Sequence, residues 1–424
     1  MKAINIIDTS LDTVGDQVQD ILEGNIGDFS SDESTSDSSQ EKFPSDLSMN
    51  HQPLRTNEHT LSYNDEEAEE EEEDNEEGDN NDWIVDKIYN ISKECYAFKH
   101  NTLRSQANPS TLSDIKIMAM NDIYLFSNEP NNSITKYFLH GMHKLIMAEL
   151  KCNKNLPEMP DKASVWCTEI SNDPPTDWIS AITKASGLLS DAITSKNIVD
   201  IHTAHTLVQT LPMFVSRSPL STVEDTYVQQ ILSPILQSIF NSDERFEIQW
   251  ANAELTSSGS KTYKPDFTLF SRIINVKCVL LVSEFKPTKC NSAVESDLVK
   301  LGRQMRSTYN DLVNNRLGNP IVCGIRSEGT RLTTYCMDMP SPNMYRMTKL
   351  SEISLHENIE QYILLPKIII KLLQLKNIAV ETVSEAESSI LFAAKTTHRR
   401  LATPPLSWLS YDSHTLSRKS KKST

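Results

Sequence analysis

The sequence has 424 residues, enough for one large or two medium-sized domains, and a formal net charge of −17 at pH 7. Its cysteines are odd in number and form no Cys-x-x-Cys pair, which argues against a disulfide framework and against a structural zinc site. The N-terminus lacks a basic segment followed by an apolar stretch, and the longest apolar stretch, 363–375, is interrupted by proline and lysine. We therefore expect no membrane span and no secretion, but a nuclear or cytoplasmic protein.

The charge is concentrated at one end of the chain. Residues 1–82 contain 25 acidic and 3 basic side chains, a net charge of −22, whereas residues 83–424 contain 33 acidic and 38 basic side chains, a net charge of +5. Such an acidic segment has too little apolar surface to offset the entropy lost on ordering, so we predict a disordered tail over 1–82. A solvating tail is the simplest interpretation. Binding of a basic protein partner, or competition with nucleic acid for a basic groove, is the functional alternative.

Residues 83–210 are expected to form a mostly helical region, to which the sequence assigns no role. Apolar residues recur at helical spacing over 137–150, and the proline-rich stretch 151–178 is typical of a loop. Two histidine pairs have i,i+3 spacing: His140 with His143 and His202 with His205. No matching cysteine or acidic pattern accompanies them, so packing roles are favoured over metal binding.

From residue 211 the order of the expected elements becomes specific, and we predict a mixed α/β domain over 211–388. In chain order we expect a helix at 222–241, strands at 246–255, 264–270 and 276–286, a helix at 297–316, strands at 321–325 and 332–337, and one or two helices at 359–380. Pro234 is expected to kink or split the first helix. Residues 389–424 are basic and poor in core residues, which predicts a flexible tail.

The strand 276–286 is apolar on both faces until its end, as in a central strand that is covered on both sides. Glu284 and Lys286 lie two residues apart, so they share a face of the sheet. Charges at the end of a doubly covered strand are costly unless they are paired or bound to a metal. The alternative is an ordinary ion pair at a strand end.

A second carboxylate is expected beside Glu284. In an antiparallel hairpin centred on Asn275, Asp266 on the preceding strand lies directly opposite Glu284. Two adjacent carboxylates repel each other and together suit a hard divalent cation such as Mg²⁺ or Mn²⁺. A lysine beside them can orient a water or stabilise charge on a phosphate, which gives the parts needed for metal-assisted phosphodiester hydrolysis.

Lys264-Pro265-Asp266, followed after a spacer by Glu284-Phe285-Lys286, resembles the PD-(D/E)XK signature of the restriction-endonuclease-like nuclease superfamily, and the element order resembles its αβββαβ core. The resemblance implies that Asp266 and Glu284 are metal ligands and that Lys286 is the catalytic lysine. It also implies the backbone carbonyl of Phe285 as a ligand.

The resemblance extends to the two helices that flank the strands. Many members of the superfamily place a glutamate on the first core helix, and Glu224 is the best match. Some carry Gln-x-x-x-Tyr on the helix after the motif, whereas this chain has Gln304 and Tyr309, one residue too far apart. Gln304 is still expected near the site. The helix also carries candidate contacts to phosphates: Lys300, Arg303 and Arg306.

The predicted function is a metal-dependent nuclease that hydrolyses phosphodiester bonds, with DNA as the expected substrate and Mg²⁺ or Mn²⁺ as the cofactor. The alternative is a catalytically inactive nuclease-fold module that binds nucleic acid or protein. A basic cluster at 418–422 is compatible with nuclear import. The overall composition resembles that of fungal-type proteins with nuclease-like cores.

Overall fold

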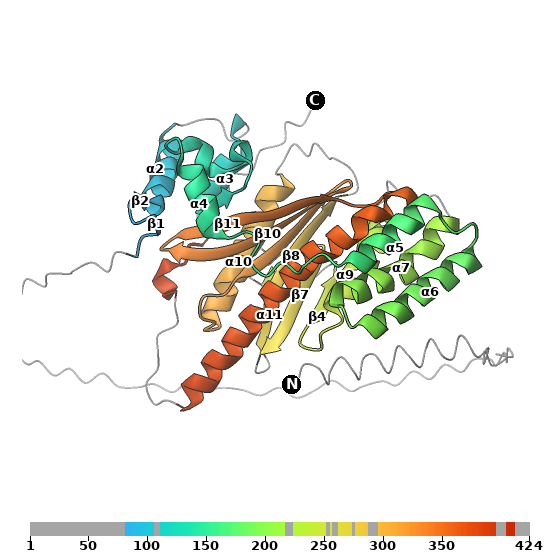
Figure 1. The fold of residues 1–424 in the computed structure, drawn as a ribbon. Coiled ribbons are helices and arrows are strands. Elements are labelled where there is room, and N and C mark those ends of the chain that lie inside the picture. The colour runs from blue at the N-terminus through green and yellow to red at the C-terminus, as the bar shows by residue number, and fades with distance from the viewer. Residues whose placement is uncertain are drawn as a thin grey trace, which may run out of the picture. The chain divides into compact units, whose positions relative to one another are not determined.

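In a computed structural model of the chain, strands of a large mixed sheet run between helices (Figure 1). The structure describes residues 81–105, 111–216, 224–251, 255–256, 262–273, 276–286, 296–395 and 404–411. Most of the predicted acidic tail, the hairpin tip at Asn275 and the basic cluster at 418–422 therefore lie outside the described residues.

Within the described residues the main sheet has seven strands. Their order across the sheet is β3 (Ile123–Phe126), β11 (Met344–Ser354), β10 (Arg331–Ser341), β9 (Val322–Glu328), β8 (Val276–Lys286), β7 (Phe267–Ile273) and β4 (Glu247–Trp250). The pairs β8–β9 and β11–β3 are parallel, and the other neighbours are antiparallel. The mixed α/β class expected from the sequence is thus confirmed.

Helices α10 (Asp297–Asn314) and α11 (Leu365–Lys395) cover opposite faces of the centre of this sheet. Successive side chains of a strand point to opposite faces, and β9 shows this directly. The Sγ of Cys323 lies 3.7 Å from the carbonyl oxygen of Leu375 on α11, whereas a side chain on Gly324 would meet α10. The centre of β8 is therefore buried, as its apolar sequence predicts.

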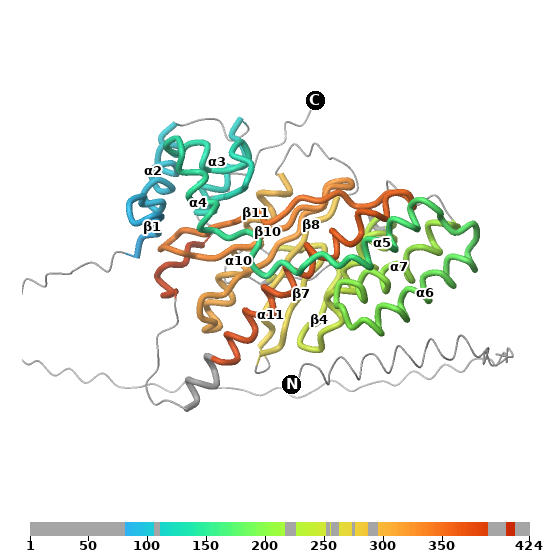
Figure 2. Tube along the Cα trace, in the orientation of Figure 1, coloured from blue at the N-terminus to red at the C-terminus, as the bar shows by residue number. Residues whose placement is uncertain are grey.

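The remaining helices gather at the two ends of the sheet, as Figures 1 and 2 show. At one end lie α2 (Ile91–Arg104), α3 (Asp114–Ala119) and α4 (Met142–Leu150), and at the other lie α5 (Asp161–Asn172), α6 (Trp178–Ser195) and α7 (Ile198–Ser216). Two small antiparallel pairs are separate from the main sheet: β1 (Ile84–Val85) with β2 (Tyr89–Asn90), and β5 (Leu255–Thr256) with β6 (Thr262–Tyr263).

The pairing of β7 with β8 has the expected register at the end that carries the charged residues. Phe267 lies opposite Ser283, so continuing the register by one residue brings Asp266 opposite Glu284. Towards the hairpin tip an irregularity after Leu269 shifts the register by one residue. This bulge changes the pairing only on the side away from the carboxylates.

The first core helix changes its winding just before Pro234. It begins as α8 (Glu224–Tyr227), widens into a π-helical turn over Val228–Leu232 and continues as α9 (Ser233–Phe240). Proline has no N–H to donate to the preceding turn, so a locally wider turn is the expected response. Pro234 was expected to kink or split the helix, and the structure shows instead a π-helical turn within a continuous helical backbone.

The region 83–210 is mostly helical, as expected, and it also contributes β3, which pairs with β11 and so belongs to the main sheet. One prediction about this half of the chain needs correction. The stretch 151–178 was expected to be a loop, but it contains the 12-residue helix α5. Prolines flank this helix rather than interrupt it, because Pro160 is its N-cap.

Two differences concern the second half. The long strand β11 was not expected, although it pairs antiparallel with β10 along most of its length, with two irregularities in the register. Residues 404–411 were expected within a flexible tail, but they pack onto the domain. The side-chain amide of Asn310 donates to the carbonyl of Ser410 at 2.9 Å, and Leu409 is buried.

Gly324 on β9 is a position where α10 leaves no room for a side chain. A Cβ at this position would lie 2.5 Å from the Sδ of Met305, which is itself fully buried. We expect Gly324→Ala to reduce the free energy of unfolding by about 1–3 kcal/mol, because buried overpacking forces side chains or backbone to shift. Urea denaturation measures this, and Gly187→Ala, where the added Cβ meets nothing within 4 Å, is the matched control.

The double variant Gly324→Ala with Met305→Ala tests the cause. If the clash with Met305 produces the loss, the alanine at 324 should cost much less once the methionine has been shortened. An equal cost in both backgrounds would contradict this explanation.

Candidate active site

Glu284 is the central residue of the site and is completely buried at the end of β8. Two side chains of α10 hold its carboxylate. The Nζ of Lys300 lies 2.6 Å from Oε2, and the Nε2 of Gln304 donates to Oε1 at 2.6 Å. Lys300 and Gln304 are four residues apart, so they occupy the same face of the helix and reach the same carboxylate.

Asp266 lies beside Glu284 at the start of β7 and is half-buried. Its Oδ2 accepts a hydrogen bond of 2.7 Å from the backbone N–H of Phe285, and its own backbone N–H donates to the carbonyl of Ser283 at 3.0 Å. Both bonds fix Asp266 against the end of β8. The two carboxylates predicted to be neighbours are therefore brought together.

The pKa of Glu284 reflects this environment. Burial, and secondly the negative charge of Asp266, raise it to about 7. The ammonium of Lys300 and the hydrogen bonds from Lys300 and Gln304 act in the opposite direction and favour the charged form. A carboxylate that remains difficult to ionise despite two donors is electrostatically suited to a further cation.

The backbone carbonyl of Phe285 faces the same region. Successive carbonyls of a strand point towards opposite neighbouring strands. The carbonyl of Lys286 accepts a 2.8 Å bond from the N–H of Gly329, which follows β9, so the carbonyl of Phe285 points towards β7 and Asp266. Lys286 is half-buried, and its position two residues after Glu284 gives both side chains the same face of the sheet.

The oxygens gathered here suit a hard cation. Among the residues that the structure describes, no group of three or more His, Cys, Asp or Glu side chains could hold a metal ion. The donors at this site are instead two carboxylates, from Asp266 and Glu284, and the carbonyl of Phe285. Oxygen donors of this type are those that Mg²⁺ and Mn²⁺ prefer, and such ions keep several water ligands.

Glu224 begins α8, but its side chain lies outside the described residues. The neighbouring turn of the helix is located by Tyr227, whose hydroxyl donates to the carbonyl of Gly329 at 2.7 Å and lies 2.8 Å from the hydroxyl of Ser327. Gly329 is the residue that bonds to Lys286. The backbone of Glu224 is thus one helical turn from a residue anchored beside the site.

The two arginines proposed to contact phosphates are buried, with 5% of Arg303 and 4% of Arg306 exposed. The guanidinium of Arg306 donates to the carbonyl of Asn121 at 2.8 Å and lies over the ring of Tyr345. The expectation for Arg306 is therefore corrected to a packing role, and the burial of Arg303 likewise opposes direct contact with a nucleic acid. Tyr309, also buried, packs edge-on against Tyr345.

Three of the four paired histidines contact hydroxyl groups of other residues, which agrees with the packing roles that the sequence favoured, whereas His140 is exposed. His143 contacts the hydroxyl of Thr135 at 2.8 Å, and His202 and His205 both contact the hydroxyl of Ser238. Burial lowers the pKa of His202 to about 3. This histidine is therefore neutral near pH 7.

Lys300 is the residue whose role the sequence did not identify. It was expected to contact phosphate, whereas in the structure it forms an ion pair with the buried glutamate. The i,i+4 spacing of Lys300 and Gln304 was the available signal. Gln304 was already expected near the site, and a residue four positions away lies on the same face of the helix, so Lys300 should lie near the site too.

A cavity of about 310 Å³ opens beside the site, along β9 and β10. Arg326 and Glu328 on β9 form one wall, and they are the parallel partners of Glu284 and Lys286 on β8. Leu298, near the start of α10, borders the same cavity. Its lining combines both signs of charge with hydrogen-bonding groups: Asp114, Asn131, Asn132, Lys136, Arg326, Glu328, Arg331, Thr333, Tyr335, Lys349 and Glu352.

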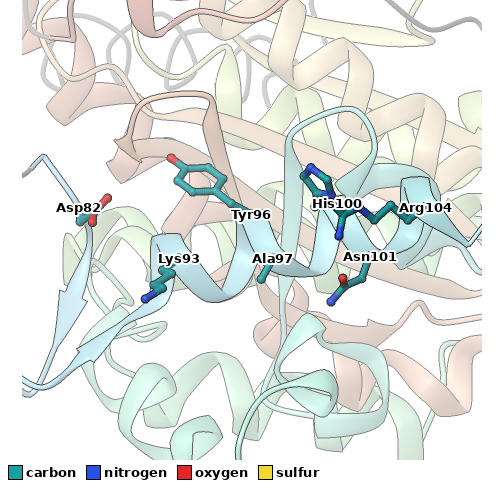
Figure 3. A pocket seen from close by; sticks show the side chains of 7 residues that line it. All are labelled: Asp82, Lys93, Tyr96, Ala97, His100, Asn101 and Arg104. Atoms are coloured by element: carbon teal, nitrogen blue, oxygen red, sulfur yellow. The ribbon is translucent and has the colours of Figure 1, made fainter.

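A second hollow, of about 500 Å³, lies along α2 (Figure 3). Its lining includes Lys93, His100 and Arg104, which recur along one side of the helix, and the carboxylate of Asp82 lies at one end. One carboxylate cannot form the acidic pair found at β7 and β8. This surface therefore lacks the donors for metal-assisted chemistry.

No helix of the described residues is long and apolar enough to cross a membrane. No protein-family model matches the sequence, and no curated protein matches it either. The assignment of function consequently depends on the geometry of the site and on the motif that forms it.

Proposed function

We propose that this protein is a metal-dependent nuclease with a restriction-endonuclease-like core. The observation that carries the proposal is the buried carboxylate of Glu284 beside Asp266, on two neighbouring strand ends of the sheet. The order α9, β4, β7, β8, α10, β9 supports it, since this is the αβββαβ order of the superfamily that the motif resembles. The small pair β5–β6 is an insertion between β4 and β7.

In this proposal Asp266, Glu284 and the carbonyl of Phe285 hold Mg²⁺ or Mn²⁺. When bound, such an ion polarises a phosphate oxygen and lowers the pKa of a water. Lys286 shares a sheet face with Glu284, so its ammonium orients the attacking water or stabilises negative charge on the phosphate. Gln304 holds one oxygen of Glu284 and so keeps the carboxylate in one orientation.

The proposed substrate is DNA, and the cavity beside the site offers room for groups next to the scissile phosphate. Its mixed charges suit a polar ring with donors and acceptors better than a second bare anion. The guanidinium of Arg326 forms an ion pair with Glu328, so both signs of charge meet on this wall of the cavity. Discrimination between DNA and RNA is an outcome of the experiment below.

The proposal predicts cleavage that depends on a divalent ion. The purified full chain is incubated with labelled single-stranded DNA, double-stranded DNA and RNA of one sequence. We expect cleavage with Mg²⁺ or Mn²⁺, loss of cleavage on addition of EDTA, and recovery when excess Mg²⁺ is added. Binding of the labelled strands without cleavage under any of these conditions would contradict the nuclease and favour a non-catalytic binding module.

A further inference from the structure

Lys300 and Gln304 hold the two oxygens of Glu284 in different surroundings. Gln304 is fully buried and binds Oε1, whereas the side chain of Lys300 is 36% exposed and binds Oε2. The solvent side of the carboxylate is therefore occupied by an ammonium group. An ion that enters past the exposed side chain of Lys300 meets Oε2 first.

Two cations are difficult to accommodate on this oxygen. Mg²⁺ binds carboxylate oxygens at about 2.0–2.1 Å, and the ammonium of Lys300 lies 2.6 Å from Oε2. An ion bound to Oε2 would lie within about 5 Å of the ammonium, and the two positive charges would repel each other in a partly buried setting.

We propose that Lys300 is a built-in competitor of the metal ion: its ammonium neutralises Glu284 in the metal-free protein and leaves Oε2 when a divalent cation binds. This inference rests on the proposed function, because it assumes that Glu284 is a metal ligand. The four-carbon side chain of Lys300 is flexible and partly exposed, so its ammonium moves into water without rearrangement of α10. Gln304, which is buried and uncharged, remains on Oε1 in both states.

Competition makes metal binding weaker than the oxygen donors alone would give. It also keeps a buried carboxylate paired in the absence of metal, when an unpaired charge would be costly. Lys300 is thus a positioning residue that sets the metal concentration at which the site fills. Its removal should change metal affinity in a direction opposite to that expected for a ligand.

The test is Mg²⁺ binding to the full chain, measured by isothermal titration calorimetry at pH 8.5. We expect Lys300→Met to bind Mg²⁺ at least about 10-fold more tightly than the wild type, because the competing charge has been removed. Lys277→Met is the matched control, since this exposed lysine lies at the other end of β8 and contacts Gln249. Its affinity for Mg²⁺ should be unchanged.

Lys300→Gln is the second variant, since glutamine can still donate to Glu284 but carries no charge, and it serves if Lys300→Met fails to fold by circular dichroism. Equal or weaker Mg²⁺ binding in the folded variant overturns the competition. Suppose that the wild type cleaves DNA and that Glu284→Gln loses Mg²⁺ binding. Equal or weaker Mg²⁺ binding in the Lys300 variant then removes only the competition by Lys300, and the proposed function stands. If the wild type neither binds Mg²⁺ nor cleaves, the proposed function fails as well.

Discussion

Glu284→Gln is expected to reduce metal-dependent cleavage by at least about 10³-fold while the protein stays folded. The amide has nearly the shape of the carboxylate. Its oxygen can accept from Lys300, and its NH2 group can donate to Gln304 once the Gln304 amide turns to present its oxygen, but it carries no negative charge for a cation. Lys286→Ala should cause a loss of similar size for a different reason, because it removes the ammonium that acts on the water or the phosphate. Initial rates at saturating Mg²⁺ measure both effects.

Glu247→Gln is the matched control for this experiment. Glu247 is a carboxylate of β4 in the same sheet, and it forms an exposed ion pair with Arg272. Loss of the Glu247 charge should leave the cleavage rate within about twofold of the wild type, because exposed ion pairs contribute little energy. Full activity in Glu284→Gln or in Lys286→Ala would show that the reaction takes place elsewhere.

The same substitution should stabilise the metal-free protein at high pH. The folded-state pKa of Glu284 is about 7, above its ordinary value of 4.5. The folded protein therefore binds this proton more tightly than the unfolded chain does. The stability that protonated Glu284 contributes is fully present below pH 4.5 and is lost as the pH rises through 7.

The loss in wild-type protein amounts to about 3 kcal/mol, from 1.4 kcal/mol per unit of pKa shift. Glutamine does not titrate, so the free energy of unfolding of Glu284→Gln relative to wild type should increase by about that amount between pH 4.5 and pH 8. Urea denaturation in EDTA at several pH values measures it. A difference that does not vary with pH would contradict the assigned environment of Glu284.

Other groups also titrate between pH 4.5 and pH 8, so the stability of wild type and Glu284→Gln must be compared at each pH. Burial lowers the pKa of His356 to about 4, so the unfolded chain takes up its proton first and stability falls as the pH drops below 6.5. His202 acts in the same direction. Both histidines are present in wild type and variant, so their contributions cancel in the difference.

The local parts of the site were predictable from the sequence. The strand 276–286 was expected with the bounds of β8, because an uninterrupted apolar stretch ending in charges has few other interpretations. The opposition of Asp266 and Glu284 followed from the symmetry of a hairpin, and the observed register of Phe267 with Ser283 agrees with it. The apolar pattern of a strand and the pairing within a hairpin depend only on residues that are close in the sequence, so a single sequence is enough to predict them.

What could not be predicted depends on contacts between distant parts of the chain. Nothing in Ile123–Phe126 indicates that this strand pairs with Met344–Ser354. The charge of Arg306 suggested a surface position, but a carbonyl and an aromatic ring supply its partners inside the protein. For Lys300, helical periodicity gives the side of the helix but not the strand that this side faces.

The parallel pairing of β3 with β11 also affects how the chain must fold and how it can be shortened. The segment Tyr345–Thr348 is paired with β3, and both partners are buried. This contact closes a very long loop, so we expect it to form late, after the local hairpins. A shortened protein that begins after residue 126 would leave one edge of β11 unpaired, and such edges invite pairing between molecules. By covering this edge of β11, β3 therefore opposes aggregation as well as extending the sheet.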